Sequence, residues 1–135
     1  MNQNTNNTNT SINNTSIDNN SINNKEVARK KFSGLLSLSN KARSLEAGEA
    51  KAEGAIKSQK AKLIIVTEDA SDNTKKKFSD MAAYRSIPII FIGDRYETGR
   101  CIGREFAVTC CITNEGFAKK MIELYNVMNL DDINS

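Results

Sequence analysis

The chain of 135 residues contains no histidine, no tryptophan, a single proline and three cysteines. Without histidine it lacks the commonest acid–base side chain at neutral pH and the usual base of serine and cysteine nucleophiles, which argues against a hydrolase. A zinc site without histidine would need unusual ligands, and three cysteines are too few for a disulfide framework. We therefore expect no catalytic residue, no metal and no cofactor, and we interpret Cys101, Cys110 and Cys111 as reduced core thiols.

Long apolar runs are absent as well. No stretch approaches the roughly 18 apolar residues that a membrane helix needs, and the N-terminus lacks the charged and apolar segments of a signal peptide. The composition, with 39% hydrophobic and 26% charged residues, is ordinary for a globular protein. We expect one compact domain, a monomer that is located in the cytoplasm and has no membrane partner.

The two ends of the chain differ in composition from its centre. Residues 1–24 are almost entirely Asn, Thr and Ser, and their few isolated isoleucines cannot offset the entropy of ordering, so we expect a disordered leader. Residues 25–127 form the expected domain, and 128–135 a flexible tail. The chain carries 19 basic and 16 acidic residues; three of the acids lie in the two ends, which leaves the domain 13 acids against 19 bases, a net charge of +6. This surplus favours a polyanionic partner.

The centre of the chain alternates helical and extended patterns. Apolar residues at helical spacing predict helices at Lys25–Ser39 and Glu49–Ser58, and continuous apolar runs predict buried strands. The other expected elements are helices that begin at Ser71 or Asp72, near Gly99 and after Asn114, an edge strand at 42–47, and strands at Leu63–Thr67, Ile89–Ile92 and Ala107–Ile112. Together they predict an α/β fold, a three-layer α/β/α sandwich around a mixed sheet of about four strands.

The acidic pair Glu68 and Asp69 follows a buried strand and permits two interpretations. The pair could bind Mg²⁺ as in phosphoryl transfer, with Lys62 or Lys75 as electrophile. That chemistry needs a third carboxylate or a phosphate-binding glycine loop, and no GxxxxGK[ST] loop occurs. Alternatively, the two acids face the positive N-terminus of the helix that begins near Ser71, which stabilises their charge without any catalysis.

Two glycines, Gly48 and Gly99, stand where helices are expected to begin. A glycine there lets an anion approach free backbone N–H groups, although an ordinary turn also explains it. If both helix starts lie on one edge of the sheet, Lys51 and the run Lys75–Lys77 form a basic rim beside them. Those three lysines cannot all face one way on a helix, and Tyr96 in a nearby loop is a weak candidate for base stacking.

Three motifs resemble a known family. They are the run Ala61–Ala70 (AKLIIVTEDA), the strand after Ile87-Pro88 and the loop Glu97–Gly103 (ETGRCIG); the run Glu68–Lys77 (EDASDNTKKK) is typical of one branch of that family. In this order and spacing, over residues 30–125, they are similar to the ribosomal protein L7Ae family and its short bacterial YlxQ-type branch. The resemblance implies an α/β/α sandwich that binds structured RNA without catalysis. The RNAs implied are kink-turns, which are helices bent sharply at tandem sheared G·A pairs.

The resemblance also implies which residues contact RNA. The family reads guanine edges with a helix start of the form Gly-x-Asn-Glu-x-x-Lys; here Gly48 is kept, while Ala50, Lys51 and Gly54 replace the three readers. The family's second loop, Leu-Gly-x-x-x-Gly, corresponds to residues 98–103, and Lys75 falls at an apolar contact with the flipped-out base. The implied RNA-binding residues are Gly48, Glu49, Ala50, Lys51, Gly54, Glu68, Lys75, Thr98, Gly99 and Arg100.

The changed readers alter the expected balance of contacts. Because a bidentate contact to a base edge is worth about 1–3 kcal/mol, their loss implies weaker guanine reading and a larger share of phosphate contacts. We expect structured RNA, ribosomal RNA in particular, as the partner, with ribosomal proteins as a further class. Two alternatives stay open: a protein-interaction module of the same fold that docks on a ribosomal or translation factor, and a small Mg²⁺-dependent enzyme built on Glu68 and Asp69.

Overall fold

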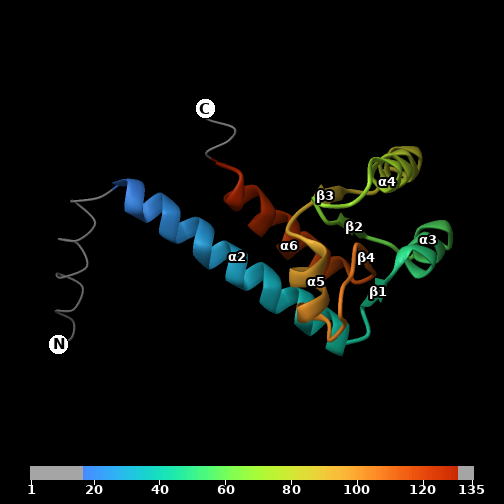
Figure 1. Ribbon diagram of the computed structural model, residues 1–135, viewed down its shortest axis with the longest axis horizontal. Helices are drawn as coiled ribbons and strands as arrows, with labels where there is room; N and C mark the ends of the chain where they lie inside the picture. The colour runs from blue at the N-terminus through green and yellow to red at the C-terminus, as the bar shows by residue number, and fades with distance from the viewer. Residues whose placement is uncertain (1–16, 131–135) are drawn as a thin grey trace.

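The computed structural model describes the backbone of residues 17–130 and the side chains of residues 23–130. Helices and strands alternate in the order α2 (Ile17–Lys41), β1 (Leu45–Ala47), α3 (Glu49–Lys57), β2 (Leu63–Val66), α4 (Asp72–Arg85), β3 (Ile89–Phe91), α5 (Arg95–Cys101), β4 (Thr109–Ile112) and α6 (Glu115–Met128). Helices α2, α5 and α6 cover one face of the sheet, and α3 and α4 cover the other (Figure 1). The predicted three-layer sandwich is confirmed.

The four strands form one mixed sheet in the order β1-β4-β2-β3, so the strand expected at 42–47 is an edge strand, shorter than predicted. Strand β4 is antiparallel to β1 and β2, while β2 and β3 are parallel. Strands β1, β2 and β3 therefore run in one direction, and their carboxyl ends meet where β4 begins. Val66 pairs there with both Thr109 and Phe91. We call this the carboxyl end of the sheet and the opposite one the amino end.

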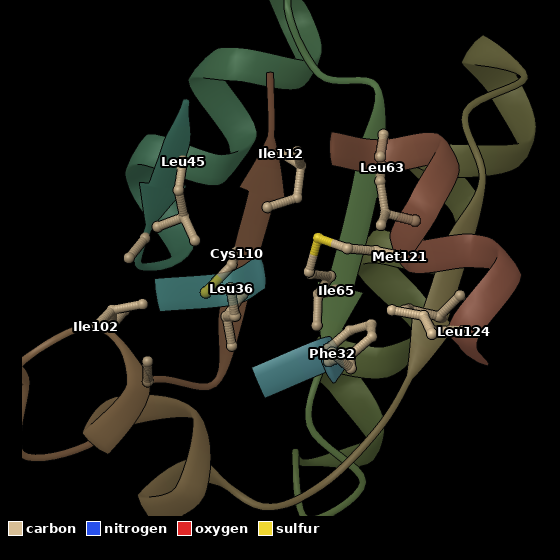
Figure 2. Packing of buried hydrophobic residues seen from close by; sticks show 14 of the residues in the cluster. Phe32, Leu36, Leu45, Leu63, Ile65, Ile102, Cys110, Ile112, Met121 and Leu124 are labelled. Atoms are coloured by element: carbon tan, nitrogen blue, oxygen red, sulfur yellow. The ribbon is translucent and has the colours of Figure 1, made fainter. Parts of the chain in front are cut away.

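Strand β2 is an uninterrupted apolar run that is buried on both faces, as its sequence predicts. On one face, Leu63 and Ile65 belong to a core with Phe32 of α2 and Met121 of α6 (Figure 2). The other face packs with α3 and α4, where Phe78 is fully buried. The sheet thus separates two hydrophobic cores, one on each face. The loops at its ends are not needed for these cores and can carry polar side chains.

The adjacent cysteines Cys110 and Cys111 of β4 point into these two opposite cores. Both are fully buried and free. Burial raises the pKa of each thiol to about 12, so both stay protonated at physiological pH. The interpretation of these two residues as core thiols is confirmed, and Cys101 at the end of α5 is free and half-buried.

Helix α2 begins at Ile17, eight residues before the predicted start at Lys25, and so includes the last part of the predicted leader. Residues 1–16 and 131–135, which contain the rest of the leader and most of the predicted tail, lie outside the described residues. The helix is anchored in the core by Ala28, Phe32 and Leu36. Once a helix has such a nucleus, each further turn costs little. At 25 residues α2 is long, but neither it nor any other described helix is apolar enough to cross a membrane.

The prediction that a helix begins near Gly99 is wrong, because α5 begins at Arg95. A capping box sets this start: the Asp94 carboxylate accepts hydrogen bonds from Tyr96 N at 2.8 Å and Glu97 N at 2.9 Å, and Asp94 N donates to the Glu97 carboxylate at 3.1 Å. Gly99 lies buried inside the helix. The Asp-x-x-Glu signal was present in the sequence and places the helix four residues earlier than the glycine does.

The predicted caps of α4 and α6 are confirmed. The Ser71 hydroxyl accepts a hydrogen bond from Thr74 N at 3.2 Å at the start of α4. The Asn114 side chain accepts one from Phe117 N at 2.9 Å at the start of α6. Each cap satisfies a backbone donor that the helix itself leaves unpaired, which is why short polar residues mark these boundaries in the sequence.

Candidate nucleic-acid interface

Four chain segments meet at the carboxyl end of the sheet: the starts of α3, α4 and α5, and the loop 102–108 that leads into β4. Backbone hydrogen bonds join them, from Gly48 N to Thr109 O at 2.9 Å, Thr67 N to Val108 O at 2.9 Å, Glu68 N to Gly93 O at 2.8 Å and Ala107 N to Arg95 O at 2.9 Å. The last bond directs Ala107 away from the ladder, so β4 begins at Thr109 rather than at the predicted Ala107. The helix starts are therefore fixed relative to one another.

A groove of about 340 Å³ opens between these segments, and we call it the carboxyl-end groove. It is lined by Gly48 and Glu49 of the α3 start, Ser71 and Thr74 of the α4 start, Arg95, and Arg104 and Phe106–Thr109 of the loop and β4. Phe106 is 54% exposed, which is unusual for a phenylalanine. Arg104 is also exposed and makes no ion pair with any described residue. An aromatic face and an unpaired cation thus flank the same groove.

Helix α3 presents an open N-terminus to this groove. Its cap residue, Gly48, has φ 98° and ψ 153° and makes no side-chain cap hydrogen bond. That backbone conformation is available to glycine and strained for other residues, while a Cβ at this position would meet no other atom within 4 Å. The first N–H groups of α3 consequently have no capping side chain, in contrast to those of α4 and α5. They favour an anion at this point.

One lysine of the predicted basic rim, Lys77, is neutralised by ion pairs between helices. Lys77 of α4 binds Glu49 at 3.0 Å and Glu53 at 2.8 Å, and Glu53 also binds Lys57 at 2.8 Å. The hydrogen bonds from Lys57 and Lys77 lower the pKa of Glu53 to about 2. The network connects α3 to α4 and holds Glu49 at the side of the groove. Lys77 is therefore a link between helices rather than a free cation.

The other two lysines of the run differ from Lys77. Lys76 pairs with Asp80 one turn later on α4, at 2.9 Å, and is an ordinary exposed helix residue. Lys75 is half-buried and makes no ion pair with the part of the chain that the structure describes. The prediction that the three lysines cannot all face one way is confirmed, and Lys75 is the one without an ion pair near the α4 start.

The acidic pair takes different positions. Asp69 binds Arg95, with 3.0 Å between the Arg95 Nε and the Asp69 carboxylate, and Arg95 also donates to the Asp69 carbonyl oxygen at 2.9 Å. Glu68 is exposed and lines a separate hollow beside Arg29 and Tyr125. No group of three or more His, Cys, Asp or Glu among the described side chains is arranged to hold a metal ion. Asp69 thus serves to fasten the α5 start.

The structure brings only some of the predicted residues together. Gly48 and Glu49 line the carboxyl-end groove. Lys51 and Gly54 line a separate hollow of about 260 Å³ with Glu46 and Lys60, and Ala50 is exposed on the first turn of α3. The remaining residues lie outside the groove: Glu68 in the hollow beside Arg29, Lys75 on the first turn of α4, Thr98 and Gly99 buried in α5, and Arg100 exposed on α5.

The sequence reasoning missed Arg104 and Phe106. Both lie in the loop that follows Gly103, where the sequence has no helical or extended pattern. The available signal was a single phenylalanine next to charged residues in a loop, since a large apolar side chain without a periodic pattern is a candidate for exposure. Tyr96, the aromatic residue considered for base stacking, is 57% exposed but does not line the groove.

The sequence is similar to a family of known proteins. Residues 30–122 match the family described as ribosomal protein L7Ae/L30e/S12e/Gadd45. Two similar relatives carry the name RNA-binding protein YlxQ. The relative from Bacillus subtilis (strain 168) is 42% identical over 90 residues, which cover 67% of this chain and 90% of the relative. The relative from Enterococcus faecium is 38% identical over 96 residues, which cover 71% and 92%.

Solved structures share the fold. A protein of unknown function from Bacillus halodurans C has a TM-score of 0.70 and 33% identity, covering 71% of this chain and 97% of that one. A 15.5kD RNA binding protein from Giardia lamblia has a TM-score of 0.62 and 17% identity, covering 78% and 89%, a likeness of fold alone. The family match begins within α2 and ends within α6, so it contains all four strands and every residue of the carboxyl-end groove.

Proposed function

Because the chain belongs to the ribosomal protein L7Ae/L30e/S12e/Gadd45 family, in the branch of the YlxQ relatives, we propose that it binds structured RNA at the carboxyl-end groove. The observation that carries the proposal is the juxtaposition of an uncapped helix start at Gly48, the unpaired Arg104 and the exposed Phe106 around one groove. The names of the two relatives support RNA as the ligand.

Each of the three features suits a different part of an RNA strand. The N-terminus of α3 accepts a phosphate, since its first N–H groups lack a cap and Gly48 leaves the approach open. Arg104 supplies a second phosphate contact or stacks on a base. Phe106 offers a face for an unpaired base, a contact worth about 1–3 kcal/mol. Structured RNA with an extrahelical base satisfies all three at once.

Three positions decide how strongly the RNA sequence is read. The side chain of Ala50 has no hydrogen-bonding group and Gly54 has no side chain, while the Lys51 side chain can donate a hydrogen bond but not accept one. In our proposal the RNA is kink-turn-like, but it is held more by its phosphates than by the guanine edges of its G·A pairs. Lys51 and Lys75 make no ion pair with other described residues and add to the phosphate contacts.

A gel-shift comparison tests this proposal. A kink-turn RNA is compared with a control RNA whose G·A pairs are replaced by Watson–Crick pairs, over a series of salt concentrations. We expect both RNAs to shift at low salt, the kink-turn at a lower protein concentration, and both affinities to fall steeply with salt. Absence of any shift at low salt contradicts RNA binding, whereas equal shifts contradict only the kink-turn preference.

Two variants localise the contact. Arg104→Ala should flatten the salt dependence by about one unit of slope for the phosphate contact that it removes. Phe106→Ala should weaken binding by about 1–3 kcal/mol without changing that slope, because stacking releases no counterion. Lys119→Ala on α6 and Tyr96→Ala are the matched controls, since they remove the same type of charge and an exposed aromatic ring, and neither residue lines the groove. If the controls weaken binding as much, the RNA lies elsewhere.

The proposed partner class is ribosomal RNA or another RNA of the translation machinery, which the family description supports. Sequencing of RNA cross-linked to the full chain in cells identifies it. Enrichment of ribosomal fragments that contain a sharp bend agrees with the proposal. Enrichment of unstructured messenger RNA contradicts it.

A further inference from the structure

Another hollow lies at the amino end of the sheet, away from the carboxyl-end groove. Its volume is about 450 Å³, and its lining comes from the segment 56–62 between α3 and β2 and the segment 85–88 between α4 and β3. Both segments precede a strand, and β2 and β3 are parallel, so both lie at the same end of the sheet. We call this space the amino-end hollow. The RNA contact proposed at the carboxyl-end groove does not involve this hollow.

The amino-end hollow combines apolar surface with free polar groups. Four of its lining residues are apolar, namely Ile56, Ala61, Ile87 and Pro88. Gln59 and Ser86 contribute an amide and a hydroxyl, and neither side chain makes a hydrogen bond with any described residue. A ligand for such a site has a flat apolar part and several hydrogen-bond acceptors.

The charges around the amino-end hollow have one sign. Lys62 and Arg85 line it, and its lining contains no acid. Arg85 ends α4 and donates to the Lys57 carbonyl oxygen at 3.4 Å, so part of its charge balances the carboxyl ends of the two helices. Lys62 belongs to neither helix, is exposed and has no ion-pair partner among residues 23–130. Its charge is left for an anionic ligand.

An aromatic ring stands beside Arg85: that of Tyr84, which precedes Arg85 in the chain and does not itself line the amino-end hollow. Tyr84 is 85% exposed, and the Arg85 guanidinium carbon lies 5.8 Å from the centre of its ring. A ring this exposed adds nothing to the core, but it offers a face on which a base can stack next to a guanidinium. Phosphate, base and hydrogen-bond acceptors together are the chemistry of a nucleotide.

We propose that the amino-end hollow binds a nucleotide of single-stranded RNA, with its phosphate on Lys62 and Arg85 and its base against Tyr84 and the apolar lining. The site does not depend on the carboxyl-end groove. The four residues of β2, each rising roughly 3.3 Å, separate the two ends, so different nucleotides occupy them.

NMR spectra of the ¹⁵N-labelled full chain test the site with three probes: a short oligouridylate, UMP and inorganic phosphate. The oligouridylate and UMP should shift the amide signals of Gln59, Lys62 and Ser86. Phosphate should shift them only at about tenfold higher concentration, because it lacks the stacking base. Equal affinity for phosphate and UMP overturns the nucleotide assignment, as does an oligouridylate that shifts only residues of the carboxyl-end groove.

Substitutions at exposed positions complete the test without risk to the core. Tyr84→Ala should weaken UMP and oligouridylate about tenfold and leave phosphate unchanged, while Lys62→Ala should weaken all three probes. Lys119→Ala, with the same charge change on the opposite layer, should weaken none. A polyglutamate peptide that shifts these amides at lower concentration than the oligouridylate assigns the hollow to an acidic protein and overturns the proposal. Arg104→Ala distinguishes the sites, because it should affect the kink-turn RNA but not these shifts.

Discussion

Gly48 and Gly99 each correspond to a glycine of the RNA-binding motifs that the sequence resembles, yet their surroundings in the structure are opposite. Gly48 stands in open space at the start of α3 with φ 98°, where the backbone conformation demands glycine. Gly99 is buried in α5, where an added Cβ would lie 2.7 Å from Phe106 Cα. Gly48 leaves the start of α3 open, and Gly99 packs closely against the loop 102–108. At these two positions glycine indicates that a side chain is poorly tolerated, but the sequence does not tell whether the backbone conformation or close packing is the reason.

The largest effect is expected from Gly99→Ala. The added methyl group would also lie 2.8 Å from the Arg104 carbonyl oxygen, and because both contacted atoms are backbone, the loop 102–108 must shift. Overpacking of this kind should lower the free energy of unfolding by about 3 kcal/mol, measured by urea denaturation. Affinity for the kink-turn RNA should fall as well, since the loop carries Arg104 and Phe106. Wild-type stability of this variant would show that Gly99 is not needed for packing.

Gly48→Ala should have a smaller effect on stability and a comparatively larger one on binding. The methyl group meets no protein atom, so the cost is the strained backbone alone, about 1–2 kcal/mol. It also covers the free N–H groups of α3, so RNA affinity measured by gel shift should fall. An affinity equal to that of the wild type, measured well below the melting temperature, would remove the α3 start from the interface.

A second pair of glycines, Gly54 and Gly34, allows a matched comparison. Gly54 of α3 and Gly34 of α2 are both exposed within helices, and a Cβ at either meets nothing. Each change to alanine should therefore raise the free energy of unfolding by about 1 kcal/mol. Only Gly54 lines the hollow with Lys51 and Lys60, so only Gly54→Ala should weaken RNA binding. If Gly54→Ala is more stable and binds RNA as well as Gly34→Ala does, no RNA backbone approaches α3 at this turn.

The smallest effect concerns the ion pairs that join α3 to α4. The pKa of Glu53 is lowered from its ordinary value of 4.5 to about 2 in the folded state. A lowered carboxyl pKa stabilises the fold fully above pH 4.5, and this contribution is lost as the pH falls towards 2. Thermal unfolding followed by circular dichroism should show a steeper fall of Tm over this range in the wild type than in Glu53→Gln. Parallel Tm curves would contradict the pairing.

Local signals in the sequence were sufficient for most of the fold. The strands follow from apolar runs such as Leu63–Val66, and the caps at Ser71 and Asn114 act within one helical turn, so neighbouring residues reveal them. The start of α5 was predicted at Gly99, which is wrong. A stronger local signal, the capping box of Asp94 and Glu97, marks the true start. The start of α2 at Ile17 was not predictable in this way, because packing elsewhere on the helix supports it.

The candidate site was predictable only in part. Gly48 and Glu49 were identified from the sequence and do line the carboxyl-end groove. The rest of the groove depends on contacts between residues far apart in the chain. Lys77 binds Glu49 across 28 positions, which turned a supposed RNA-binding cation into a structural link. Phe106 became a candidate only when the loop that carries it was seen beside the start of α3.

The sequence by itself determined the alternation of helices and strands, the core and the family resemblance, because these depend on apolar periodicity and on motifs that are contiguous in the chain. Only the tertiary structure decided which charges are free and which glycine is open. Pairing and burial are properties of segments that meet at the ends of the sheet. Strand β4 joins these segments because it runs antiparallel to its two neighbours, β1 and β2. Gly48 and Gly99 look alike in the sequence because their environments come from elsewhere in the chain.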